Sequence, residues 1–109
     1  MAYDEGLAER LREIFEGRRG IAEKRMFGGL CFLLNGNMVV GIVRDELMVR
    51  VGPNEHATVL SLPHVRPMDF TKQPMKGFAF VGPDGFDSQA DLEAWVARCV
   101  RFVRTLPAK

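Results

Sequence analysis

Cysteine is scarce in this sequence, and signals for secretion are missing. Only Cys31 and Cys99 occur in 109 residues, whereas small disulfide-dependent domains usually carry about four or more cysteines. Both lie in apolar runs, where a free cysteine usually packs as a small hydrophobic residue, although the sequence alone leaves a bridge between them open. The N-terminus turns acidic at once and lacks the apolar segment of a secretory signal. We therefore expect a reducing, cytoplasmic environment.

Long apolar runs and an excess of one charge are also missing. The apolar runs extend over a few residues each, far short of a membrane span, so no membrane partner is expected. Fifteen Lys and Arg residues against fourteen Asp and Glu residues give a formal net charge of +1, which is too small to attract nucleic acid by bulk electrostatics. A hydrophobic content of 47% fits one globular domain over residues 1–109.

Catalytic and metal-binding motifs are absent as well. The sequence has no glycine-rich phosphate loop, no paired-cysteine zinc pattern and no zinc-protease helix motif. His56 and His64 lack a nearby acidic or thiol cluster, so we expect surface or hydrogen-bonded histidines rather than metal ligands. Cys31 would need a base and a lowered pKa to act as a nucleophile, and its apolar neighbours favour inert packing. No catalytic residue, metal ligand or cofactor is therefore expected.

Three helices are predicted from apolar residues at helical spacing. The first spans residues 4–17, with Asp4 as its cap. The second is short, over residues 54–62, with Ala57, Val59 and Leu60 facing inward. The third opens at Ser88 and runs to about residue 105. The apolar side of the first helix comprises Leu7, Leu11, Ile14 and Phe15, and its solvent-facing side comprises Glu5, Glu9, Arg10, Arg12 and Glu13. The apolar side of the third helix comprises Leu92, Trp95, Val96, Cys99, Phe102 and Val103.

Between the helices the apolar pattern becomes that of strands, at residues 24–27, 30–34, 38–43, 47–51, 68–70 and 77–81. Asn35 and Gly36 tolerate the positive φ of a two-residue hairpin turn, whereas Gly28 and Gly29 are interpreted as a bulge or bend. Hairpins favour an antiparallel sheet. The predicted fold is an α+β two-layer sandwich, an antiparallel sheet of about five strands with the N- and C-terminal helices packed on one face.

Both faces of this sheet are predicted to be apolar. A two-residue turn at Asn35 and Gly36 pairs Leu33 with Met38 and Cys31 with Val40. The terminal helices can cover only one face, and a bare apolar face is a liability in a monomer. We therefore expect a homodimer, or cover from the loops or the short middle helix. Strict alternation groups Cys31, Leu33, Val40 and Ile42 on one face, and Leu30, Phe32, Leu34, Val39 and Val43 on the other.

Residues 66–77 contain Pro-Met followed by a charged residue twice, and they form a candidate segment for docking a partner. Pro67 and Pro74 cannot donate a backbone hydrogen bond, so the segment must run along a sheet edge or form a loop. Exposed methionines make adaptable contacts; the alternative is a hairpin in which Asp69 pairs with Lys76. The candidate docking residues are Met68, Asp69, Phe70, Met75 and Lys76.

A second candidate site is basic. Arg98, Arg101 and Arg104 follow i, i+3 spacing on the last helix and are candidate phosphate-contacting residues. The alternative is a solvated helix face with cations near the C-terminal dipole. Direct nucleic-acid binding is the weaker expectation, because the aromatic residues that could stack on bases lie mostly in apolar runs. The basic residues around the first loop are Arg18, Arg19, Lys24 and Arg25.

Several of these segments together resemble one protein family. Residues 25–29, which read Arg, Met, Phe, Gly and Gly, resemble the opening of the TfoX N-terminal domain. The similarity continues through residues 30–32, 35–37, 47–50 and 66–77 and through the terminal helix with Trp95, over nearly the whole chain. The resemblance implies an α+β fold with an antiparallel sheet.

The resemblance also implies regulation without catalysis. TfoX-type proteins switch on genes for DNA uptake in competent bacteria by assisting a transcription factor. The full-length regulators carry a second, C-terminal domain that this sequence does not include, so a stand-alone N-terminal domain is expected. The expected function is a non-enzymatic regulatory or interaction domain that acts through a protein partner such as a transcription factor. The alternatives are direct nucleic-acid binding and a small-ligand-binding domain.

Overall fold

The computed structural model describes residues 3–26, 28–68 and 75–109. Within them the helices are α1 (Glu5–Phe15), α2 (His56–Leu60), the 3-10 helix η1 (Pro83–Phe86) and α3 (Gln89–Val103). The strands are β1 (Ile21–Met26), β2 (Gly29–Leu34), β3 (Asn37–Val43), β4 (Glu46–Arg50), β5 (Val65–Pro67) and β6 (Phe78–Val81).

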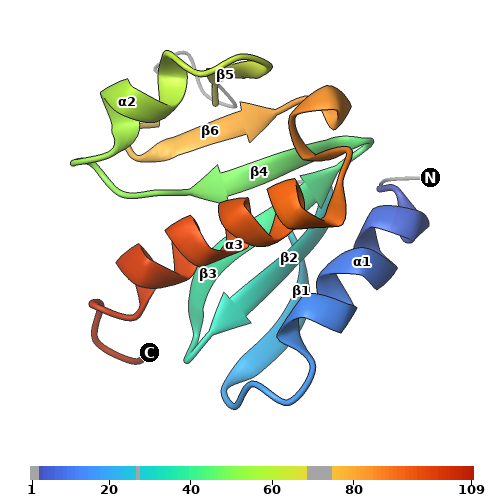
Figure 1. The fold of residues 1–109 in the computed structure, drawn as a ribbon. Helices are drawn as coiled ribbons and strands as arrows, with labels where there is room; N and C mark the ends of the chain where they lie inside the picture. The colour runs from blue at the N-terminus through green and yellow to red at the C-terminus, as the bar shows by residue number, and fades with distance from the viewer. Residues whose placement is uncertain (1–2, 27, 69–74) are drawn as a thin grey trace.

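The strands form one antiparallel sheet in the order β1-β2-β3-β4-β6-β5 (Figure 1). The predicted α+β architecture is confirmed. The sheet of the described residues has six strands because the short β5 pairs with β6 at one edge. Pro67 lies in this edge strand, where a missing backbone donor does not interrupt the sheet.

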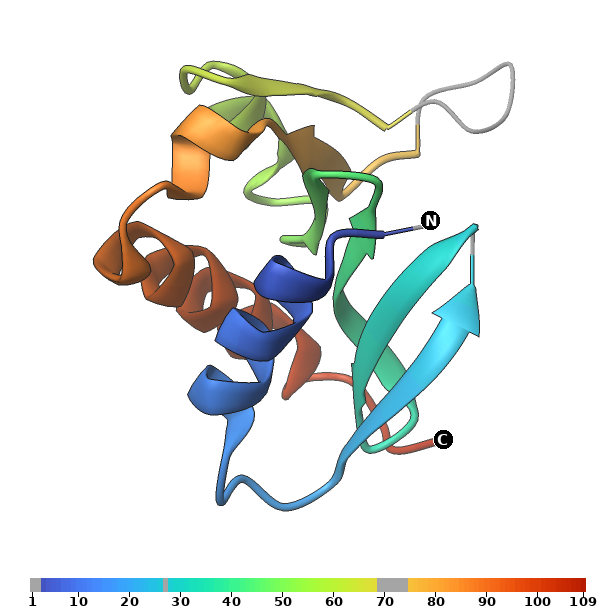
Figure 2. The same ribbon diagram turned by 90° about the vertical axis from the view of Figure 1, so that its right-hand side faces the viewer.

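Both terminal helices pack on the same face of the sheet, as predicted (Figure 2). The expected caps are present at their starts. The carboxylate of Asp4 accepts a hydrogen bond from the backbone N–H of Gly6 at 2.8 Å, and the hydroxyl of Ser88 accepts one from Asp91 at 3.1 Å. A cap of this kind is worth about 1 kcal/mol, so local sequence chemistry determines where each helix begins.

Two local predictions are wrong. Gly28 was expected in a bulge or bend, but β1 ends at Met26, β2 begins at Gly29, and these two residues pair across a hairpin. Gly28 supplies a φ of +74° in this turn, which glycine adopts without steric penalty. In α2, Ala57 is exposed rather than inward, because a helix of five residues buries only Val59.

The pairing of β2 with β3 contains an extra residue. Leu33 lies opposite Met38 as predicted, but Phe32 lies opposite Val40, so Val39 has no partner in β2. A bulge of this kind interrupts the alternation of side chains along one strand. Val39 and Val40 consequently both belong to the core beneath the helices.

This bulge corrects the predicted assignment of side chains to the two faces. Val40 and Ile42 lie in the main core with Phe32, beneath α1 and α3, while Val43 packs against the opposite cluster. The prediction placed Val40, Ile42 and Val43 on the wrong sides because it assumed uninterrupted alternation from the turn at Asn35.

The sheet buries apolar side chains on both faces. The main core fills the layer between the sheet and the terminal helices. On the opposite face lies a second cluster, whose most exposed member is only 7% exposed. Met68, which follows β5, is part of this cluster, so a segment of the chain itself covers part of this face. Cover from within the chain was one of the two expected alternatives, and the other, a homodimer, stays a prediction. The second cluster consists of Cys31, Met38, Met48, Met68 and Phe80.

Gly29 and Gly41 allow a test of the close pairing of β2 with β3. A Cβ atom at Gly29 would collide with the backbone carbonyl oxygen of Ile42, whereas at Gly41 its nearest neighbour is the flexible end of Met48, at 2.6 Å. Since a paired backbone cannot move aside, we expect Gly29→Ala to lower the free energy of unfolding by about 3 kcal/mol and Gly41→Ala by about 1 kcal/mol. Urea denaturation measures both; equal losses would contradict the close approach at Gly29.

Candidate functional site

The predicted docking segment is only partly accessible. Met68 is fully buried in the second cluster, so the expectation that its side chain is available to a partner is wrong. Met75 is half-buried against the same cluster, and Lys76 is exposed. Asp69 and Phe70 lie outside the described residues. Proline content indicated an edge strand, but it could not indicate that the apolar face of the sheet draws the adjacent Met68 inward.

All methionines of the described residues lie in or against the second cluster. Met38, Met48 and Met68 are buried, and Met26 and Met75 are half-buried beside them. The backbone N–H of Met75 donates to the carbonyl of Met68 at 2.9 Å. Methionine is flexible and fills irregular gaps, so these residues form a small second core on the face away from α1 and α3.

This interpretation predicts a stability effect at Met68. Met68→Ser removes a fully buried thioether side chain and places a hydroxyl in an apolar site, so the free energy of unfolding should fall by about 3 kcal/mol. Lys76→Ser, at an exposed position in the same segment, should change it by less than about 0.5 kcal/mol. Thermal unfolding compares the two variants, and an unchanged melting temperature for Met68→Ser would restore this residue as a docking candidate.

The two cysteines are buried free thiols. Burial raises the pKa of Cys31 to about 11, and that of Cys99 to about 12. Because the thiolate is the reactive form of cysteine, the environment of Cys31 agrees with the predicted inert packing.

Thiol labelling tests this description. With an aromatic disulfide reagent at pH 8, we expect neither Cys31 nor Cys99 to react in the native protein and both to react in denaturant. The raised pKa values also predict that stability declines as pH rises above 9.0, the ordinary thiol value, because the unfolded chain then releases protons that the folded chain retains. Rapid labelling of Cys31 in the native state would contradict its burial.

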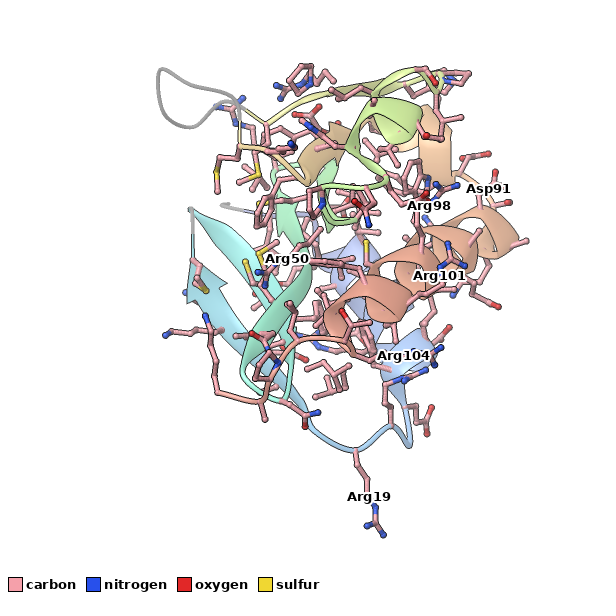
Figure 3. All side chains as sticks on the ribbon, turned by 90° about the vertical axis from the view of Figure 1, so that its left-hand side faces the viewer. Arg19, Arg50, Asp91, Arg98, Arg101 and Arg104 are labelled. Atoms are coloured by element: carbon pink, nitrogen blue, oxygen red, sulfur yellow. The ribbon has the colours of Figure 1, made fainter. Side chains whose placement is uncertain are left out.

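Arg98 and Arg101 of α3 and Arg104, directly after it, follow one another along the helix axis but have different surroundings (Figure 3). Arg98 donates to Glu55 at 2.8 Å and lies over the ring of Trp95. Arg101 is 3.9 Å from the same carboxylate, and its side chain is 65% exposed. Arg104 is exposed, and no carboxylate of the described residues forms an ion pair with it. Of the predicted phosphate-contacting residues, Arg101 and Arg104 thus stay the more accessible to an anion.

Arg101 and Arg104 line a groove between α1 and α3 with a volume of about 570 Å³. Arg18, which follows α1, lines the same groove, so the fold brings one arginine of the first loop together with two from α3. Arg19 points away from this region at the tip of the loop (Figure 3). The floor of the groove is apolar, but only a small part of it is exposed, because Val96 and Val100 are 4% and 5% exposed. Its apolar residues include Ile14, Val96 and Val100.

One residue of α1 fixes the two walls of the groove at one end. Arg10 was predicted on the wet side of α1, but it is half-buried. Its guanidinium donates to the side chain of Gln89 at 3.0 Å and to the carbonyls of Phe86 and Ser88 at 2.8 and 3.1 Å. These carbonyls lie just before α3, so Arg10 ties α1 to the beginning of α3.

The groove has an acidic and a basic end. Glu13 and Glu93 line it about one turn beyond the Arg10–Gln89 contact on their respective helices. Both helices then run on from this contact (Figure 1), toward Arg18 after α1 and toward Arg101 and Arg104 at the end of α3. Cations are favourable there because the C-terminal ends of helices carry partial negative charge.

Sequence reasoning did not identify Glu13, Ile14 or Glu93 as site residues. A signal existed in α3, where Glu93, Val96, Val100 and Arg104 recur at helical spacing along one stripe. The stripe could not be assigned to a groove without the position of α1, which depends on the contacts of Arg10.

The groove combines cations, carboxylates and apolar surface, an arrangement suited to binding. Among the residues that the structure describes, no group of three His, Cys, Asp or Glu side chains could hold a metal ion. Within the described residues, every helix is too short or too polar to cross a membrane.

Comparison with known proteins gives a family match. Among models of protein families, that of the TfoX N-terminal domain matches residues 13–103 of the 109-residue chain. No curated protein and no solved structure matches the chain significantly. The matched range contains the sheet, α2, α3 and most of the residues that line the groove.

Proposed function

Because the chain belongs to the TfoX N-terminal domain family, we propose that it is a non-enzymatic regulatory domain that acts on transcription by binding a protein partner. The groove between α1 and α3 carries this proposal. It offers a small apolar area around the half-buried Ile14, with Arg101 and Arg104 at one end, and arginine beside apolar surface is the composition that protein interfaces favour.

Direct binding of nucleic acid is the second candidate, since Arg18, Arg101 and Arg104 lie together. Two features of the same groove weigh against it. Glu13 and Glu93 would repel phosphate groups, and the apolar surface between the helices offers nothing to a phosphate backbone. The net charge of +1 adds little attraction over longer distances. A protein partner fits this mixture of groups better.

The proposal predicts a transcriptional effect of the groove. In the source cells, Arg101→Glu with Arg104→Glu should reproduce the transcript changes caused by deleting the gene, because reversed charges repel an acidic partner. Genes for DNA uptake, which TfoX-type proteins switch on, are the first transcripts to measure. The melting temperature should change little, since both side chains are exposed. Arg19→Glu, which reverses a single charge outside the groove (Figure 3), should leave transcripts unchanged.

Two results would contradict the proposal. If deletion of the gene leaves transcript levels unaltered, the protein has no regulatory role. If the charge-reversed variant gives normal transcripts, the groove is not the surface through which the protein regulates transcription. Fluorescence anisotropy with duplex DNA distinguishes direct binding of nucleic acid from binding of a protein partner. Direct phosphate contacts would give binding that weakens steeply between low and moderate salt and is lost in the charge-reversed variant.

A further inference from the structure

The dimensions of the groove limit what can lie in it. Glu93 of α3 and Arg104, which directly follows α3, are eleven residues apart and both line it. At a rise of about 1.5 Å per residue, the groove runs along α3 for roughly 16 Å, the length of about three helical turns. A segment of this length can place apolar side chains over Ile14, Val96 and Val100 on the floor of the groove.

The walls of the groove favour a helical segment over an extended one. Both walls are helices, whose backbone groups are bonded within α1 and α3 over most of their length, so the groove has no strand edge with which an extended peptide could pair. A helix satisfies its own backbone groups and needs only an apolar stripe on one side.

The charges of the groove determine the direction of such a helix. A helix tolerates acidic residues best in its first turn and basic residues best in its last turn, because of its dipole. The first turn therefore belongs beside Arg18, Arg101 and Arg104, and the last turn beside Glu13 and Glu93. In this orientation the bound helix runs antiparallel to α3, and its positive end lies near the negative C-terminal end of α3.

We infer that the groove between α1 and α3 binds one amphipathic helix of the partner, about three turns long, antiparallel to α3, with acidic residues in its first turn and basic residues in its last. This inference rests on the proposed function, since it specifies the segment by which the protein partner docks. It also gives Glu13 and Glu93 a role, in selecting direction.

A displayed library of helical peptides of about 14 residues, long enough for three turns, tests the inference on the purified chain of residues 1–109. Selection is run in parallel on the wild type and on the Arg101→Glu, Arg104→Glu variant. Peptides enriched by the wild type should share an apolar stripe and acidic residues in the first turn, and the acidic preference should disappear with the variant. The best peptide should bind that variant at least about tenfold more weakly and bind Arg19→Glu normally.

A spin label on the selected peptide tests its direction. A label on the first residue should broaden the amide resonances of Arg101 and Arg104, and a label on the last residue should broaden that of Glu93. The reverse pattern would overturn the antiparallel orientation. Peptides without an apolar stripe, equal binding to the charge-reversed variant, or displacement of the peptide by duplex DNA would overturn the inference as a whole.

The peptide experiment and the transcript experiment distinguish a failure of this inference from a failure of the proposed function. If the peptide results contradict the inference while the charge-reversed groove still alters transcripts, the regulatory proposal holds and the helical partner does not. If the peptides behave as expected but deletion of the gene leaves transcripts unaltered, the groove binds a helix and the transcriptional role is wrong.

Discussion

The extra residue in β3 determines which side chains each face of the sheet buries. Because side chains alternate along a strand, one inserted residue exchanges the sides of all those beyond it. Beyond the bulge, Val40 and Ile42 of β3 face the terminal helices, and pairing with β4 extends this arrangement to Leu47 and Val49. Met48 lies on the other side, in the second cluster. The layer that supports α1 and α3, and hence the groove between them, depends on this one bulge.

Sequence reasoning succeeded where the chemistry is local. Asp4 and Ser88 begin helices as expected, and Asn35 and Gly36 have the positive φ values of 51° and 85° that their turn requires. The bulge was not predictable in this way, because Val39 is one of several similar apolar residues in its strand. Only the pairing with β2 across space shows that it has no partner, and a shift of one residue was enough to misassign half of a strand.

The candidate site was predictable to a smaller degree, for the same reason. Helical spacing places Arg98, Arg101 and Arg104 along one side of α3, but it carries no information about which acidic group lies opposite. Glu55 reaches Arg98 from 43 residues away in sequence, and Arg10 reaches Gln89, the first residue of α3, from 79 residues away. These long-range contacts determine that Arg98 is paired while Arg104 stays accessible.

The size of the groove also limits how strongly it can bind. A three-turn helix covers one strip of surface, and contacts that bury less than about 1,200 Å² in total belong to weak or transient associations. Exposed arginines at the rim mainly raise the association rate, and salt screens their effect. The apolar surface of Val96 and Val100, both largely buried beneath the groove, can supply only a modest hydrophobic contribution. Binding through this groove is therefore expected to be rapid and reversible, so that occupancy follows the concentration of the partner, as a regulatory contact requires.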